Sequence, residues 1–264
     1  MSKTISKFSL TIVLFLFTAV SLSAGAVNAY YSAPYADAKA VKSNLGKAGF
    51  KVLTSYSPAK KDYLKVIVFT NSKLKSIASK KSRGFAAVQR VLVNSKTKTV
   101  LATNPQYWLK AFMQKDFQPG SCKSITASIG KALGKLTPTT DAVDGGKLSH
   151  YHFMMSMPYY EDMIELKDGA KSVKNKLFEV KLANGSTLIG VKMSKGAESF
   201  ISTIGEDKAL VLPYTVLLEG GKAYALHAKY YLAISYPQLT MGEFMKISSI
   251  PDKIERTLKK SIKK

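Results

Sequence analysis

The sequence repeats one apolar pattern at a constant offset of 125 residues. The pattern is a short apolar block of the kind found in strands, followed by one face of a helix on which apolar residues recur at every fourth position. The aligned residues are Val91-Leu92-Val93 with Val216-Leu217-Leu218, and Ile125, Ile129 and Leu133 with Ile250, Ile254 and Leu258. Because strand block and helix face keep their spacing without a gap, the pattern predicts an internal duplication.

The duplication divides the chain into two units. We expect a first unit at 30–136, a linker at 137–149 and a second unit at 150–264. In both units strand patterns alternate with helix patterns, such as the helix predicted over Pro105–Met113, and hairpin turns such as Gly220-Gly221 join the strands. The sequence predicts an α+β fold made of two tandem copies of a β-α-β-rich unit, with helices packed on an antiparallel sheet. We expect a ligand in the groove between the two sheets, because pockets favour such interfaces.

Two segments carry a resemblance to a known family. They are Ala38–Leu53, "AKAVKSNLGKAGFKVL", and Ala209–Ala225, "ALVLPYTVLLEGGKAYA". The first is similar to the opening helix and glycine-phenylalanine turn of domain-of-unknown-function family 302, and the second to its proline-containing strand and hairpin. The first unit departs from this pattern, since Val88-Gln89 stands where the second unit has Pro213-Tyr214. The resemblance implies a compact sandwich of helices on one antiparallel sheet and no catalytic residues.

The N-terminal segment has the pattern of a secretory signal peptide. Lysines precede an apolar stretch from Phe8 to Leu22, and small residues follow it. Both Ala24-Gly25-Ala26 and Val27-Asn28-Ala29 fit a signal-peptidase site, and we expect cleavage at the second, which removes residues 1–29. We expect no transmembrane segment after this cleavage, because no later segment is long and apolar enough. The sequence therefore predicts a soluble, periplasmic or secreted protein.

Basic residues are in large excess, and nearly all of them are lysines. The formal net charge is +23, and only three of the 40 basic residues are arginines, namely Arg83, Arg90 and Arg256. Proteins that read nucleic acid rely on arginine for bidentate contacts, and export separates the chain from nucleic acid, so we expect no such partner. A lysine-coated soluble surface is the simpler interpretation, and attraction to an anionic envelope surface is the alternative.

The segment "SHYHFMMSMPYYEDM", residues 149–163, contains two of the three histidines and four of the nine methionines. Its place at the start of the second unit predicts a strand, and alternation along that strand puts His150, His152 and Met154 on the face away from the core. Imidazole and thioether groups suit copper or haem iron, so these three residues are the candidate metal ligands, with a purely structural strand as the alternative. His227, on another predicted strand, is a further candidate.

Signals of catalysis are few. Cys122 is the only cysteine and precedes a predicted helix, whose N-terminus can stabilise a thiolate, but at the repeat offset it aligns with Ile247, which favours an apolar role. Glu161 and Asp162 are adjacent on the predicted strand, so their side chains point apart and favour turn or cap roles. We therefore expect an exported binding module of unknown ligand rather than an enzyme. The alternatives are an envelope-associated interaction protein and, third, a thiol-dependent enzyme.

Overall fold

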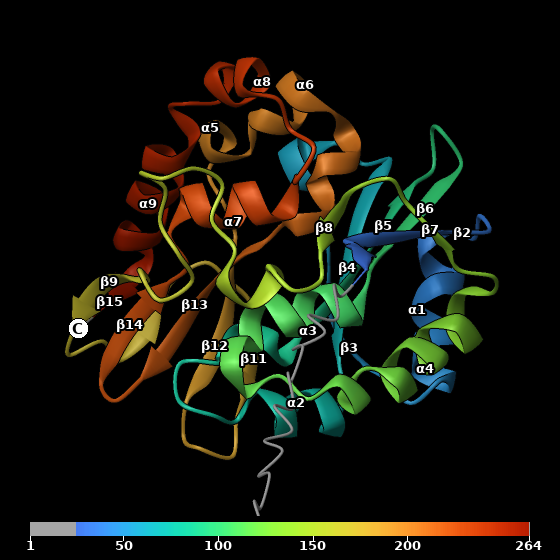
Figure 1. Cartoon of the computed structure of the whole chain (residues 1–264), viewed down its shortest axis with the longest axis horizontal. Coiled ribbons are helices and arrows are strands. Elements are labelled where there is room, and N and C mark those ends of the chain that lie inside the picture. The colour runs from blue at the N-terminus through green and yellow to red at the C-terminus, as the bar shows by residue number, and fades with distance from the viewer. Residues whose placement is uncertain (1–24, 264) are drawn as a thin grey trace, which may run out of the picture.

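The structure, a computed structural model, describes residues 25–263. Antiparallel sheets carry helices on their faces, so the fold class is α+β, as the sequence predicts (Figure 1). Residues 1–24 of the predicted signal peptide lie outside the described residues.

The first large sheet belongs to the N-terminal half of the chain. Its strands lie in the order β3-β4-β5-β6-β2-β7, and every neighbouring pair is antiparallel. The strands are β2 (Tyr30–Ala33), β3 (Lys51–Tyr56), β4 (Leu64–Thr70), β5 (Gln89–Asn94), β6 (Thr99–Thr103) and β7 (Thr137–Pro138). The helices of this half are α1 (Ala38–Lys47), α2 (Ser72–Ala78), α3 (Pro105–Met113) and α4 (Lys123–Leu133), with short 3-10 helices η1 (Pro58–Lys60), η2 (Gly84–Ala87), η3 (Gln114–Asp116) and η4 (Pro119–Ser121).

The second large sheet belongs to the C-terminal half. Its order is β11-β12-β13-β14-β9, again antiparallel throughout. The strands are β9 (Ile164–Asp168), β11 (Lys176–Lys181), β12 (Thr187–Val191), β13 (Tyr214–Glu219) and β14 (Lys222–Ala225). The helices are α5 (Lys195–Glu198), α6 (Phe200–Ile204), α7 (Ala228–Ser235), α8 (Met241–Lys246), α9 (Ile250–Ser261), η5 (Leu148–His150) and η6 (Glu206–Val211). Two small sheets pair β1 (Ala26–Asn28) with β8 (Ala142–Asp144), and β10 (Ser172–Val173) with β15 (Ile262–Lys263).

The two large sheets have the same strand order when the short β7 is set aside. If the strands of each large sheet are counted along the chain, the second, third, fourth and fifth lie side by side, and the first joins beyond the fifth. The apolar blocks of the sequence repeat form β5 and β13, which lie inside their sheets, and burial of such strands explains why the repeat is clearest there. The duplication itself remains a prediction, and superposition of 30–136 on 150–264 is its test.

Helices α3 and α7 join the two halves at the centre of the molecule (Figure 1). Tyr107 Oη donates to Ile234 O at 2.7 Å, and Tyr230 Oη donates to Ala111 O at 3.4 Å. The two bonds are reciprocal, because donors and acceptors are each 123 residues apart in the sequence. A contact of this form resembles the isologous interface of a symmetric dimer.

In each half, one short 3-10 helix packs on the large sheet of the other half. The 3-10 helix η2, which precedes β5, packs on β12 and β13, and η6, which precedes β13, packs on β5 and β6. A Cβ on Gly84 in η2 would lie 2.3 Å from Leu217 Cδ1, so the close approach depends on glycine. Buried apolar side chains from both halves consequently form one continuous core.

The segment predicted as a linker is in part held by the first half. Within 137–149, β7 pairs with β2, β8 pairs with β1, and Thr139 N donates to Tyr30 O at 3.1 Å. The parts of the connection that form β7 and β8 therefore have strand partners in the first half.

Residues 26–29, which lie inside the predicted signal peptide, are part of the fold. The side chain of Ala29 is fully buried, and its carbonyl oxygen accepts hydrogen bonds from Asn104 N and Trp108 Nε1, both at 3.0 Å. Removal of Ala29 would leave two buried donors without this acceptor, which costs about 1–3 kcal/mol for each donor.

We therefore expect the mature protein to begin at Val27, because cleavage after Ala26 keeps Ala29 in place. Mass spectrometry of the N-terminal peptide of the protein purified from its native host measures this directly. A mature chain that begins at Tyr30 would show that the fold tolerates the loss of β1.

Candidate functional site

The strand predicted to carry His150, His152 and Met154 is absent. His150 ends η5, and residues 151–163 form turns and loop, while β9 takes the sheet position predicted for this segment. Strand alternation was therefore the wrong reason for grouping these side chains. The metal ligands themselves remain a prediction.

Two tyrosines hold this segment away from the sheet. Tyr151 Oη donates to Ala233 O at 3.2 Å, and Tyr160 Oη donates to Ser82 O at 2.7 Å. Both acceptors are distant in sequence, so tertiary hydrogen bonds decide the path of the segment.

His227 does not lie on a strand either. It is the N-cap residue of α7, and its Nδ1 accepts a hydrogen bond from Lys229 N at 3.2 Å. Burial lowers the pKa of this imidazole, which favours the neutral form that accepts the bond. Within residues 25–263, no group of three or more His, Cys, Asp and Glu side chains is placed to hold a metal ion.

Cys122 lies in an environment that disfavours a reactive thiolate. Its Sγ donates to Pro119 O at 3.2 Å, and the side chain is buried. Burial raises the pKa of the thiol, whereas a nucleophilic cysteine needs a lowered pKa. The third alternative, a thiol-dependent enzyme, gains no support from this geometry.

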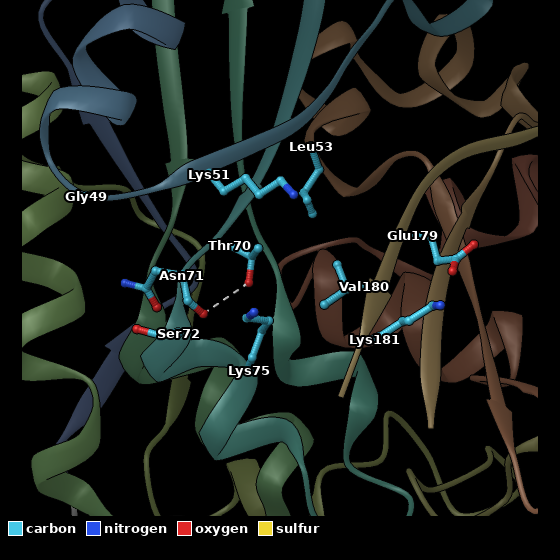
Figure 2. A pocket seen from close by; sticks show the side chains of 10 residues that line it. All are labelled: Gly49, Lys51, Leu53, Thr70, Asn71, Ser72, Lys75, Glu179, Val180 and Lys181. Atoms are coloured by element: carbon cyan, nitrogen blue, oxygen red, sulfur yellow. Dashed lines mark hydrogen bonds between the residues drawn. The ribbon is translucent and has the colours of Figure 1, made fainter. Parts of the chain in front are cut away.

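A cavity of about 440 Å³ lies between the two halves, where the edge strands β3 and β11 face each other (Figure 2). We call it the cleft. It is lined by Gly49, Lys51, Leu53, Thr70, Asn71, Ser72, Lys75, Glu179, Val180 and Lys181. The cleft occupies the groove between the sheets in which we expect a ligand.

The end of α1 positions the β3 wall of the cleft. Phe50 N donates to Leu45 O at 3.0 Å and Gly49 N donates to Gly46 O at 3.1 Å, with Gly49 at φ +87°. This helix-ending motif needs a residue that tolerates a left-handed backbone, which glycine does at little cost. The chain turns directly into β3 and so brings Lys51 to the cleft.

The first turn of α2 forms the floor of the cleft. Asn71 Oδ1 accepts a hydrogen bond from Leu74 N at 2.8 Å and so caps the helix, which leaves the amide nitrogen of Asn71 as a donor. Lys75 follows one turn later. Figure 2 shows Lys51 and Lys75 extending into the space between the walls, with Glu179 and Lys181 on the facing strand.

The cleft is positively charged. Among residues 25–263, no ion pair involves Lys51, Lys75 or Lys181. The lining carboxylate, Glu179, already pairs with Lys176 at 2.5 Å. The protein thus leaves three ammonium groups around the cavity without a carboxylate partner, and this arrangement attracts anions.

Two hydrogen bonds join the halves at residues that follow the two cleft strands in sequence. Ala183 N, just beyond β11, donates to Ser79 Oγ at 3.1 Å, and Ala59 N, just beyond β3, donates to Glu198 Oε2 at 2.6 Å. Glu198 is only 4% exposed, and its Oε1 has no hydrogen-bond partner among the described residues. Burial raises the pKa of this carboxyl to about 7, although the bond from Ala59 N opposes the shift.

No local pattern in the sequence distinguishes the cleft lysines. Lys51 and Lys181 are 130 residues apart, and lysines are so common in this chain that no spacing distinguishes them. Only the approach of two sheet edges brings them together.

Comparisons with models of protein families, with curated proteins and with solved structures find no match for this chain. The resemblance to domain-of-unknown-function family 302 therefore stays a prediction. None of the helices within residues 25–263 has both the length and the apolar character that crossing a bilayer requires.

Proposed function

We propose that the protein is an exported binding protein that holds a small anionic ligand in the cleft. The observation that carries this proposal is the set of unpaired lysines Lys51, Lys75 and Lys181 around a cavity of about 440 Å³. This volume lies within the range of roughly 300–1,000 Å³ that is usual for small-molecule sites.

The chemistry of the cleft suits a ligand with several phosphate or carboxylate oxygens. The ammonium groups supply charge, and the Asn71 amide and the Ser72 hydroxyl supply neutral donors. Hydrogen bonds between ionised partners are about twice as strong as those between neutral groups. Ammonium groups are compact point charges on flexible stems, so they can adapt to more than one anion.

Haem is not supported by the cleft. Its lining residues include no histidine, methionine, cysteine or tyrosine that could serve as an axial ligand to iron. The cleft therefore gives no support to haem binding. The predicted copper ligands His150, His152 and Met154 lie outside the cleft.

Calorimetric titration of the exported protein with pyrophosphate and with citrate tests the proposal. We expect one molecule of at least one of these anions to bind per chain. The double variant Lys51→Gln/Lys75→Gln should weaken its binding about tenfold or more, equivalent to about 1.4 kcal/mol or more. The matched control is Lys39→Gln/Lys42→Gln, which removes the same charge from exposed positions of α1 outside the cleft.

An equal loss in the two double variants would mean that only the overall charge attracts the anion, and would contradict a site in the cleft. Failure of both anions to bind would also contradict it. Vesicles of phosphatidylglycerol test the envelope-surface alternative, in which the net charge of +21 that remains without Lys3 and Lys7 supplies the attraction. That binding should fall with added salt and respond alike to both double variants.

A further inference from the structure

Methionines dominate the exposed apolar side chains of the described chain. The large apolar side chains that are exposed in residues 25–263 are Tyr35, Met154, Met155, Tyr159, Met241 and Met245. Four of these six are methionines, although the whole chain has only nine. Exposed thioethers gather on two elements, the loop after η5 and the short helix α8.

A pair of stacked rings holds these two elements together. The ring of Phe153 in the loop lies 5.7 Å from the ring of Phe244 in α8, with an angle of 23° between the planes. Met154 follows the first ring, and Met241 and Met245 lie three residues before and one residue after the second. Since Met241 and Met245 are four residues apart on a helix, they share a face. The stack therefore brings the backbone that carries Met154 next to the helix that carries the other two.

The start of α8 is fixed by a capping box. Glu243 N donates to Thr240 Oγ1 at 3.2 Å, and Thr240 N donates to Glu243 Oε2 at 2.9 Å. This reciprocal pair satisfies two backbone donors and holds the first turn of the helix in place. Met241 is therefore presented from a well-defined backbone.

His152 is oriented as metal-binding histidines are. Its Nδ1 lies 2.9 Å from the carbonyl oxygen of Met154. A carbonyl oxygen only accepts, so Nδ1 carries the proton, and the Nε2 of the neutral ring keeps its lone pair. In metal sites, a bond from one ring nitrogen to a backbone carbonyl commonly fixes the tautomer that leaves the other nitrogen to the metal. The ring of Tyr159, 4.5 Å away, packs against the imidazole.

We propose that His152 Nε2 and the thioethers of Met154, Met241 and Met245 bind a soft monovalent cation, Cu(I) or Ag(I). Thioether and imidazole are uncharged ligands that suit soft metals. A protein with so large a positive net charge also repels a monovalent cation less strongly than a divalent one. The proposed site shares no lining residue with the cleft, so it is independent of anion binding there.

This site differs from the one that the sequence predicted. His150 ends η5 and is exposed, and no strand holds it beside His152. Met155 is 97% exposed, so its thioether extends into solvent beside the proposed site. His150 and Met155 therefore provide matched controls of the same residue types from the same segment.

Titration with Ag(I) in chloride-free buffer, followed by NMR of 13C-labelled methionine methyl groups, tests the proposal. All proteins carry Cys122→Ala, because a thiol would compete for the metal. We expect one Ag(I) per chain, with shifts of the methyl signals of Met154, Met241 and Met245. His152→Ala and the double variant Met241→Leu/Met245→Leu should each weaken binding about tenfold or more.

His150→Ala and Met155→Leu should leave the affinity unchanged. The leucine variants are close in volume to methionine and lie at exposed positions, so the thermal melt should not change and a loss of binding cannot come from unfolding. The proposal is overturned if Ag(I) does not bind saturably, or if it binds equally well to the Met241→Leu/Met245→Leu variant. It is also overturned if His150 rather than His152 is required.

Discussion

Trp108→Ala is expected to lower the free energy of unfolding by about 3–5 kcal/mol, the usual loss for a large buried aromatic side chain. The indole is 4% exposed, and its Nε1 donates to Ala29 O at 3.0 Å. Ring centroids from both halves lie within 6.1 Å of the indole, those of Tyr30, Tyr107, Phe112 and Tyr231. The substitution thus removes the centre of the contact between the halves, and the loss is a large fraction of the roughly 5–15 kcal/mol that stabilises a typical domain.

Urea denaturation followed by far-UV circular dichroism measures the loss. Because Trp108 is the only tryptophan, its fluorescence in the wild-type protein reports on the contact between the halves. We expect fluorescence and circular dichroism to follow a single common transition, as cooperative unfolding requires. Tyr35→Ala, at an exposed position, is the control and should change stability by no more than about 0.5 kcal/mol. Two separate transitions in the wild type would show that the halves unfold independently.

Glu198→Gln should remove a loss of stability that the wild-type protein suffers as the pH rises. Burial raises the pKa of the folded carboxyl from 4.5 to about 7, so between these values the folded state holds a proton that the unfolded state has released. The contribution of Glu198 is therefore fully favourable below pH 4.5 and is lost as the pH rises through about 7. At about 1.4 kcal/mol per pH unit, the loss is about 3–4 kcal/mol.

Urea denaturation of both proteins at pH 4.5, 6 and 8 checks this linkage. Relative to the wild type, Glu198→Gln should gain stability steadily from the lowest to the highest pH. Glu206→Gln is the control, because the bonds from Lys61 and Tyr63 lower the pKa of the Glu206 carboxyl. The contribution of Glu206 is lost only as the pH falls below 4.5, so the stability difference between this variant and the wild type should change little across the three pH values. A stability difference between wild type and Glu198→Gln that is the same at every pH would contradict the raised pKa.

Local sequence patterns gave good predictions for elements whose ends are determined by residues at those ends. The helix predicted over Pro105–Met113 has those bounds in the structure, because proline fits its first turn and Asn104 Oδ1 accepts from Gln106 N at 3.0 Å. The apolar block at Val91–Val93 is a buried strand, as predicted. Gly84–Ala87, a little before this block, form η2, which packs on the second sheet and does not extend the strand.

Local patterns in the sequence predicted the candidate sites much less well than they predicted the fold. The pairing of His152 with Met154 was predicted from strand alternation, but the structure places them in a loop. Helix α8, which carries Met241 and Met245, was not predicted, because six residues are too few for a clear apolar period. Its position beside the loop follows from one ring stack between residues that are 91 positions apart.

The sequence by itself determined the α+β class, the central strands of both sheets and the excess of lysine, because these depend on composition and on spacing within a few turns of chain. Only the tertiary structure decided which lysines share a cleft and how residues 151–163 run. The cleft exists because two sheet edges approach each other, and the loop is held by tyrosine hydroxyls that donate to carbonyl oxygens more than 70 residues away. Such long-range contacts leave no regular spacing in a sequence, so neither the set of cleft lysines nor the contact between the loop and α8 could be derived from it.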